Sequence, residues 1–159
     1  MVLQKTATLK TATLKTIFSD VLANLAFMFT DDAQLDAAPG QVWLETVIEY
    51  EGPVRGLLRF RCTREFAVML ASNLLGTDPD SEDALQQDED AVKEFMNIVC
   101  GQFVTAMHGT DDIYNLTIPR TTQLSEAPDL IDDGGLTACT FCVDSQVIQL
   151  MYEPQPTGS

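Results

Sequence analysis

The sequence predicts an α+β domain in which helices pack on an antiparallel sheet, with the elements in the order αββααβββ. Apolar residues recur every three or four positions in three segments, which is the spacing of amphipathic helices. In other segments apolar and polar residues alternate, as in strands with one buried face. Glycine and proline separate these segments, and 45% of the 159 residues are hydrophobic, which is enough for one domain with its own core.

The first helix is predicted from about residue 14, where apolar side chains begin to follow helical spacing. Its stripe consists of Ile17, Phe18, Val21, Leu22, Leu25, Met28 and Phe29. The acids and the Pro-Gly pair within residues 31–40 are expected to end it. Before it, the pentad TATLK occurs twice, too few copies for a repeat architecture. Residues 1–13 are interpreted as a flexible N-terminal arm or as extra helical turns, ahead of a single domain over residues 14–153.

A β-hairpin is predicted over residues 41–62, with a turn at Gly52-Pro53 and a three-residue loop. The positions expected to face the core are Val42, Leu44, Thr46, Ile48, Tyr50, Leu58, Phe60 and Cys62. The opposite face carries Glu45, Glu49 and Glu51 on the first strand and Arg55, Arg59 and Arg61 on the second. Cross-strand ion pairs therefore explain the arginines without any ligand.

Two more helices follow the hairpin. Thr63 is expected to cap a helix that runs to Leu75, with Gly76 as its C-cap and Phe66, Leu70 and Leu74 as its stripe. An acidic loop then leads into a long helix over residues 88–108, which Gly109 ends. The apolar stripe of this long helix consists of Val92, Phe95, Met96, Val99, Phe103 and Met107.

The remaining residues read as β structure. One strand is expected around residues 113–124, interrupted by Pro119, which favours an edge position or a bulge. Two further strands, over 136–143 and 146–153, are joined at Asp144-Ser145. Residues 154–159, PQPTGS, are expected to form a disordered tail.

Charge and hydropathy exclude several classes of function. The net charge of −15 argues against nucleic acid, whose phosphates require clustered lysine and arginine, and against an anionic membrane surface. A protein or cationic partner remains compatible with it. No apolar run approaches the length of a membrane span, and residues 1–15 show no apolar signal-peptide core, so a cytoplasmic location is expected.

Metal and nucleophile sites are also disfavoured. Cys139 and Cys142 lie three apart in a strand-like segment, so they point to opposite faces, and the single histidine is distant in sequence. The acidic loop places acids at four EF-hand ligand positions, but Asp83 stands where the sharp turn needs glycine. These four acids are Asp78, Asp80, Glu82 and Glu89. Because no Gly-x-Ser-x-Gly motif or phosphate-binding glycine loop is present, an enzyme with this sequence must work with carboxylates and amides.

One face of the 88–108 helix is the candidate site. Asp90, Glu94, Asn97, Gly101 and His108 lie broadly opposite the apolar stripe, at steps of three and four. Solvation alone explains most such faces. However, asparagine is an indifferent helix former, and a mid-helix glycine costs about 1 kcal/mol relative to alanine. Gly101 also removes bulk beside Asn97, which would let another molecule approach. The residues alone leave both a solvated face and a functional face open.

The spacing Asp90-x3-Glu94-x2-Asn97, followed by Pro119 on the next strand, resembles the signature of the CheC/CheX/FliY phosphatases of bacterial chemotaxis. Over about residues 14–153 the order of elements is also similar, most of all to CheX. The resemblance implies a hydrolase that removes the phosphoryl group from an aspartate of a CheY-type response regulator. It also implies that the regulator supplies Mg²⁺ and a lysine, so no cofactor of the chain's own is expected.

The resemblance also assigns roles by position. Asn97 matches the amide that orients a water for in-line attack on phosphorus, and Glu94 matches the acid that pairs with the regulator's lysine. For Asp90 three roles stay open: docking the partner, orienting Glu94, or only favouring the start of the helix. Gly101 is expected to leave room for the docked partner. The resemblance further implies a homodimer joined through sheet edges. The alternative function is a non-catalytic CheX-like module that binds a response regulator or a motility protein.

A second site is not expected on the first helix. CheC-type members of the family carry a second, similar motif there. Here this helix offers Asn24, but Val21 stands where the acid should be. The sequence therefore predicts one working site.

Overall fold

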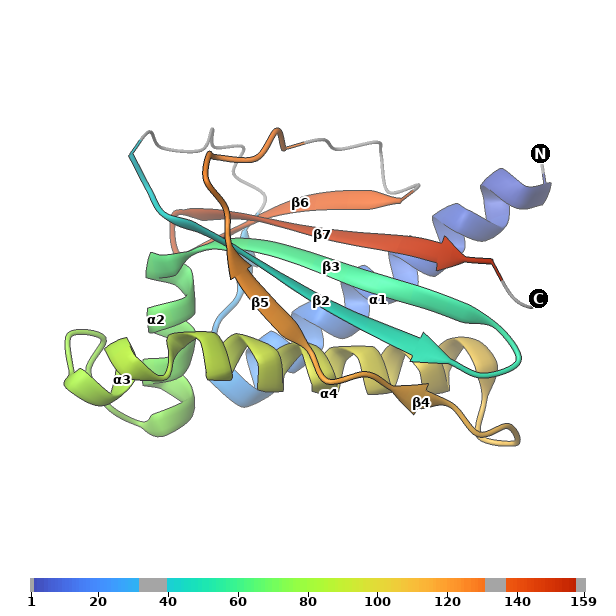
Figure 1. Cartoon of the computed structure of the whole chain (residues 1–159), viewed down its shortest axis with the longest axis horizontal. Coiled ribbons are helices and arrows are strands. Elements are labelled where there is room, and N and C mark those ends of the chain that lie inside the picture. The colour runs from blue at the N-terminus through green and yellow to red at the C-terminus, as the bar shows by residue number, and fades with distance from the viewer. Residues whose placement is uncertain (1, 32–39, 131–136, 157–159) are drawn as a thin grey trace.

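Helices cover one face of an antiparallel sheet in the computed structural model, which describes residues 2–31, 40–130 and 137–156 (Figure 1). The elements in chain order are α1 (Val2–Ala26), β1 (Thr30–Asp31), β2 (Trp43–Glu51), β3 (Arg55–Thr63), α2 (Arg64–Leu75), α3 (Glu82–Gln86), α4 (Asp88–His108), β4 (Asn115–Leu116), β5 (Arg120–Gln123), β6 (Ala138–Val143) and β7 (Gln146–Gln155). The predicted α+β class is confirmed. β1 and α3 were not predicted from the sequence.

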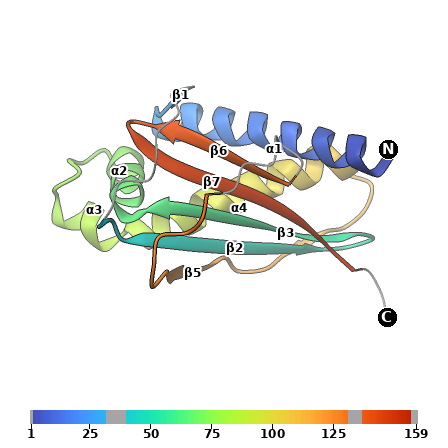
Figure 2. The same ribbon diagram turned by 90° about the horizontal axis from the view of Figure 1, so that it is seen from above.

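The strands are ordered β1-β6-β7-β3-β2, and both β4 and β5 pair with the outer edge of β2. All neighbouring strands are antiparallel. On the covered face, α1 lies at the β6 side of the sheet and α4 at the β2 side, with α2 packed against α4 (Figure 2). The predicted strand around 113–124 is therefore two short edge strands, and Pro119 lies between them, at the edge position that proline favours.

α1 begins at Val2, so residues 2–13 are helical turns, one of the two forms left open for them. Its stripe is buried at Phe18, Val21, Leu22 and Met28, but Leu25 and Phe29 are 40% and 67% exposed. The helix ends at Ala26, earlier than expected, because Phe27 turns the chain with φ of 55°. The side-chain amide of Asn73 on α2 donates to the Ala26 carbonyl at 2.8 Å and so satisfies this helix end.

The β2–β3 hairpin has the predicted three-residue loop, with Glu51 and Arg55 at its two ends. Arg59 and Arg61 each donate to Glu45 at 2.8 Å, and Arg55 pairs with Glu51 at 3.1 Å. The predicted face of ion pairs is thus present at Glu45 and Glu51. Glu49, by contrast, lies opposite Leu57 in the register, not opposite an arginine.

The β6–β7 hairpin turns at Asp144-Ser145, as predicted, and both residues have positive φ, 48° and 66°. Positive φ at both central residues is the requirement of a type I′ turn. β7 then continues through Pro154 and Gln155, which pair with Gly56 and Arg55. The first two residues of the predicted disordered tail therefore belong to a strand, while residues 157–159 lie outside the described part of the chain.

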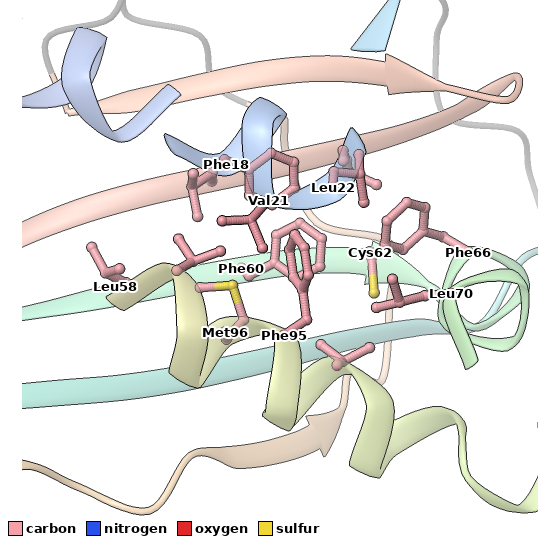
Figure 3. Packing of buried hydrophobic residues seen from close by; sticks show 14 of the residues in the cluster. Phe18, Val21, Leu22, Leu58, Phe60, Cys62, Phe66, Leu70, Phe95 and Met96 are labelled. Atoms are coloured by element: carbon pink, nitrogen blue, oxygen red, sulfur yellow. The ribbon is translucent and has the colours of Figure 1, made fainter. Parts of the chain in front are cut away.

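Aromatic rings tie α1 and α4 to the sheet. Phe18 on α1 lies 5.4 Å from Phe60 on β3 and 5.2 Å from Phe95 on α4, measured between ring centroids (Figure 3). The ring centroid of Phe141 on β6 lies 5.1 Å from that of Phe18. All four rings are buried. Because each ring comes from a different element, this cluster fixes where α4 lies relative to the sheet.

Candidate functional site

The candidate residues share the outer face of α4. Asp90, Glu94 and Asn97 are exposed, and Gly101 is partly exposed. At 3.6 residues per turn, these four positions fall within roughly 60° of the helix circumference. The structure therefore brings the four predicted site residues of this helix into one stripe, with the carboxylate of Glu94 and the amide of Asn97 one turn apart.

The opposite face of α4 is held in the core. Val92, Phe95, Met96, Val99 and Phe103 are fully buried, which confirms most of the predicted apolar stripe, and Met107 is partly buried. α4 contacts α1, α2 and β2 through this face. A helix fixed on three sides holds the side chains of its exposed face in a constant geometry.

An ion pair whose acid is buried lies at the start of α4, and it was not predicted from the sequence. Asp88 is only 3% exposed, its Oδ1 accepts the Glu89 backbone N–H at 2.8 Å, and its Oδ2 lies 3.4 Å from Arg64 Nη1 on α2. An acid in a first helical turn is ordinarily explained by the helix dipole alone. Burial of Asp88 depends on the packing of α2 against α4, which no local pattern of residues reveals.

His108 does not belong to the exposed stripe. Its ring stacks on Tyr114 at 5.2 Å with an interplanar angle of 18°, and it lies 5.9 Å from the ring of Tyr50. His108 is half-buried. His108 therefore has a packing role. The candidate site consists of the other four residues predicted on this face, Asp90, Glu94, Asn97 and Gly101.

Nothing in the described part of the chain requires a glycine at position 101. A Cβ added to Gly101 would meet no atom within 4 Å, and the residue lies in the middle of α4. By contrast, a Cβ on Gly56 would lie 2.6 Å from the Tyr50 hydroxyl, so internal packing does explain that glycine. The space beside Gly101 is open to another molecule.

The first helix offers no matching acid at the expected place. Val21 is buried in the core, and Asn24 is exposed. A polar site built on α1 with the spacing of α4 would need a carboxylate where Val21 packs. The expectation of one working site stays a prediction.

The described residues do not assemble a metal site. Among them no group of three or more histidine, cysteine, aspartate or glutamate side chains is placed to hold a metal ion. Cys139 and Cys142 are both buried, and of the two only Cys139 belongs to the core cluster on the helix side of the sheet. Part of the acidic loop is the short helix α3, whose first turn carries Glu82 and Asp83 behind an N-cap at Ser81. Within the described ranges, no helix is long and apolar enough to cross a membrane.

Comparison with known families and structures gives consistent matches. The model of the family described as "Chemotaxis phosphatase CheX" matches residues 45–135, more than half of the chain. No curated protein matches the sequence. The chain is similar to the chemotaxis protein CheX of Desulfovibrio desulfuricans at 18% identity, covering 92% of this chain and 99% of that one, with a TM-score of 0.66.

Two other solved structures share the fold. The chain is similar to CheX of Borrelia burgdorferi, solved as a CheX–CheY–BeF3–Mg²⁺ complex, at 20% identity, covering 91% of this chain and 97% of that one, with a TM-score of 0.63. It is also similar to FliY of Thermotoga maritima at 13% identity, covering 84% and 81% of the two chains, with a TM-score of 0.50.

Proposed function

Because the chain belongs to the family of the chemotaxis phosphatase CheX, we propose that it hydrolyses the aspartyl phosphate of a CheY-type response regulator. The observation that carries the proposal is the exposed pair Glu94 and Asn97 on a helix whose other face is buried in the core. A rigid helix can enter the phosphoryl site of a partner and deliver both side chains together.

Asn97 is proposed to orient the attacking water. A side-chain amide both donates and accepts hydrogen bonds, so it can hold a water with a lone pair directed at phosphorus. Phosphoryl transfer needs this positioning more than it needs covalent help from the protein, as the water-orienting glutamine of GTPases illustrates. Asn97 is exposed, which leaves its amide available for a partner's phosphoryl group.

Glu94 is proposed to make the docking contact with the regulator. It stands one turn before Asn97 on the same face and is exposed. A carboxylate at this place can pair with the lysine of the regulator, and that pair would fix the distance between Asn97 and the phosphorus. Asp90, one further turn back, adds negative charge to the docking face.

The magnesium ion is proposed to be bound by the regulator and not by this chain. The exposed face of α4 offers two carboxylates, Asp90 and Glu94, and no third acid in the described residues joins them to hold a metal. When bound in the regulator, Mg²⁺ would neutralise charge on the phosphoryl oxygens. The chain's own part is to position a water and to hold the partner.

The test is phosphate release from purified CheY-type receiver proteins of the same genome, phosphorylated with a small-molecule phosphodonor in the presence of Mg²⁺. The wild type should accelerate release from at least one receiver, and Asn97→Ala should reduce that acceleration about a hundredfold, since an oriented polar group contributes on this scale. Gln102→Ala is the matched control, because Gln102 is an exposed amide on α4 outside the stripe.

Two results would contradict the proposal. If Asn97→Ala and Gln102→Ala both release phosphate at the wild-type rate, Asn97 has no part in the chemistry. If the wild type binds receivers loaded with beryllofluoride but accelerates release from none of them, the chain is a non-catalytic binding module of the same fold.

A further inference from the structure

The outer edge of the sheet contains a β-bulge at Ile118-Pro119. Leu116 pairs with Tyr50, and Arg120 pairs with Val47. Between these two pairs β2 has residues 48 and 49, whereas the edge has residues 117, 118 and 119, which is one more. The Thr117 backbone N–H donates to the Glu49 carbonyl at 2.9 Å, and the Thr117 hydroxyl accepts the Glu49 N–H at 3.0 Å. Ile118 and Pro119 together therefore oppose Ile48.

The bulge coincides with an aliphatic side chain that lies outside the core. Ile118 is 85% exposed, whereas Ile48 across the ladder is fully buried. Leu116 and Thr121, on either side of the bulge, pair with the core-facing residues Tyr50 and Thr46. A strand that kept its alternation from Leu116 would put residue 118 on that core-facing side as well. Bulges re-aim side chains in this way and occur next to functional sites.

Ile118 lies in the edge segment that joins β4 to β5. β4 and β5 lie beside α4, and α1 lies on its other side (Figures 1 and 2). The edge itself is unsuited to accept another strand, because the bulge interrupts the ladder and Pro119 has no N–H. A partner at this edge must therefore make contact through side chains.

We propose that Ile118 is a docking residue for the regulator, and that it packs against an apolar patch next to the regulator's lysine. This inference rests on the proposed function. The α4 face offers the carboxylates of Asp90 and Glu94, and the adjoining bulge offers an unpaired aliphatic chain. The partner that complements both is a receiver domain with a cationic group beside apolar surface. A second copy of this chain, at net charge −15, lacks that complementarity.

The chain offers a matched control for the test. Ile113 is 82% exposed, but its backbone lies near Gly52 at the β2–β3 turn, away from the bulge. Ile118→Ser should raise the KM for the phosphorylated receiver about tenfold with little change in kcat, because the contact binds the partner without touching the phosphoryl group. Ile113→Ser should change neither constant. Thermal unfolding should be the same for both variants, since neither side chain is buried.

The outcomes separate this inference from the proposed function. If Ile118→Ser keeps the wild-type KM while Asn97→Ala loses turnover, the docking role is wrong and the proposed function stands. If the wild type lacks turnover, the affinity for a beryllofluoride-loaded receiver is compared instead, and equal affinities of Ile118→Ser and wild type overturn the docking role. If Ile118→Ser instead converts a dimer to a monomer in sedimentation, the surface binds a second copy, which also overturns it.

Discussion

Replacing Gly101 with alanine should make the protein more stable and the proposed phosphatase less effective. An alanine in the middle of a helix is favoured over glycine by about 0.5–1 kcal/mol. Among the described residues the added Cβ would meet no atom within 4 Å, so no clash with them offsets this gain. For a domain of this size, 1 kcal/mol corresponds to a rise in Tm of about 2–4 °C. Urea or thermal unfolding of the two proteins measures the difference directly.

The same methyl group should weaken docking. If the space beside Asn97 is kept open for a regulator, a Cβ at position 101 occupies part of it and a larger side chain fills it. Gly101→Ala should therefore raise the KM several-fold, by about 1 kcal/mol of lost contact, and Gly101→Leu should abolish saturable release. Gln102→Leu is the control, because it adds the same side chain to an exposed position beside the stripe.

Two separate measurements can refute this reasoning. Wild-type kinetics in both Gly101→Ala and Gly101→Leu would show that no partner approaches this part of α4. A lower Tm in Gly101→Ala would show that the glycine relieves a constraint within the folded chain, which contradicts the open space around it. A gain in stability together with a loss of binding is the pattern of a residue kept for function.

Two further predictions concern charge. Glu94→Lys should weaken binding of a beryllofluoride-loaded receiver by tenfold or more, about the cost of one like-charge contact; unchanged affinity in titration calorimetry would remove Glu94 from the docking contact. Burial raises the pKa of the Cys100 thiol from 9.0 to about 12. Between these two values the thiol of the unfolded chain ionises while the buried thiol stays protonated. The free energy of unfolding should therefore fall as pH rises from about 9 toward 12. Cys100→Ala should lessen this fall, and identical pH profiles would contradict the assignment.

Local signals predicted the elements that carry the site. Thr63 accepts the Phe66 N–H at 3.1 Å as the N-cap of α2, and Gly76 ends that helix in the left-handed region. α4 begins at Asp88 and ends at His108, as its apolar spacing predicted. Each of these features depends on residues within a few positions of one another, so the sequence displays it directly.

Features that depend on distant residues could not be predicted in this way. The bulge is defined by the register of residues 116–120 against β2, about 70 positions earlier in the chain. Pro119 indicated an edge or a bulge, but only the register shows that Ile118 is the side chain left outside. Likewise, Asp88 is buried because α2 packs against α4, and its partner Arg64 lies on that other helix. Contacts between residues far apart in the sequence cannot be predicted from local patterns of residues.

Three locally unfavourable residues lie on α4 and on the sheet edge beside it. Asn97 and Gly101 are weak helix formers in the middle of α4, and Ile118 is an aliphatic chain in water beside that helix. None of the three is explained by packing, since Asn97 and Ile118 are exposed and the space at Gly101 is empty. A surface shaped only for solubility would carry alanine, lysine or glutamate there. A docked partner would explain all three residues. Docking would bury the isoleucine, fill the space at the glycine and form hydrogen bonds with the amide.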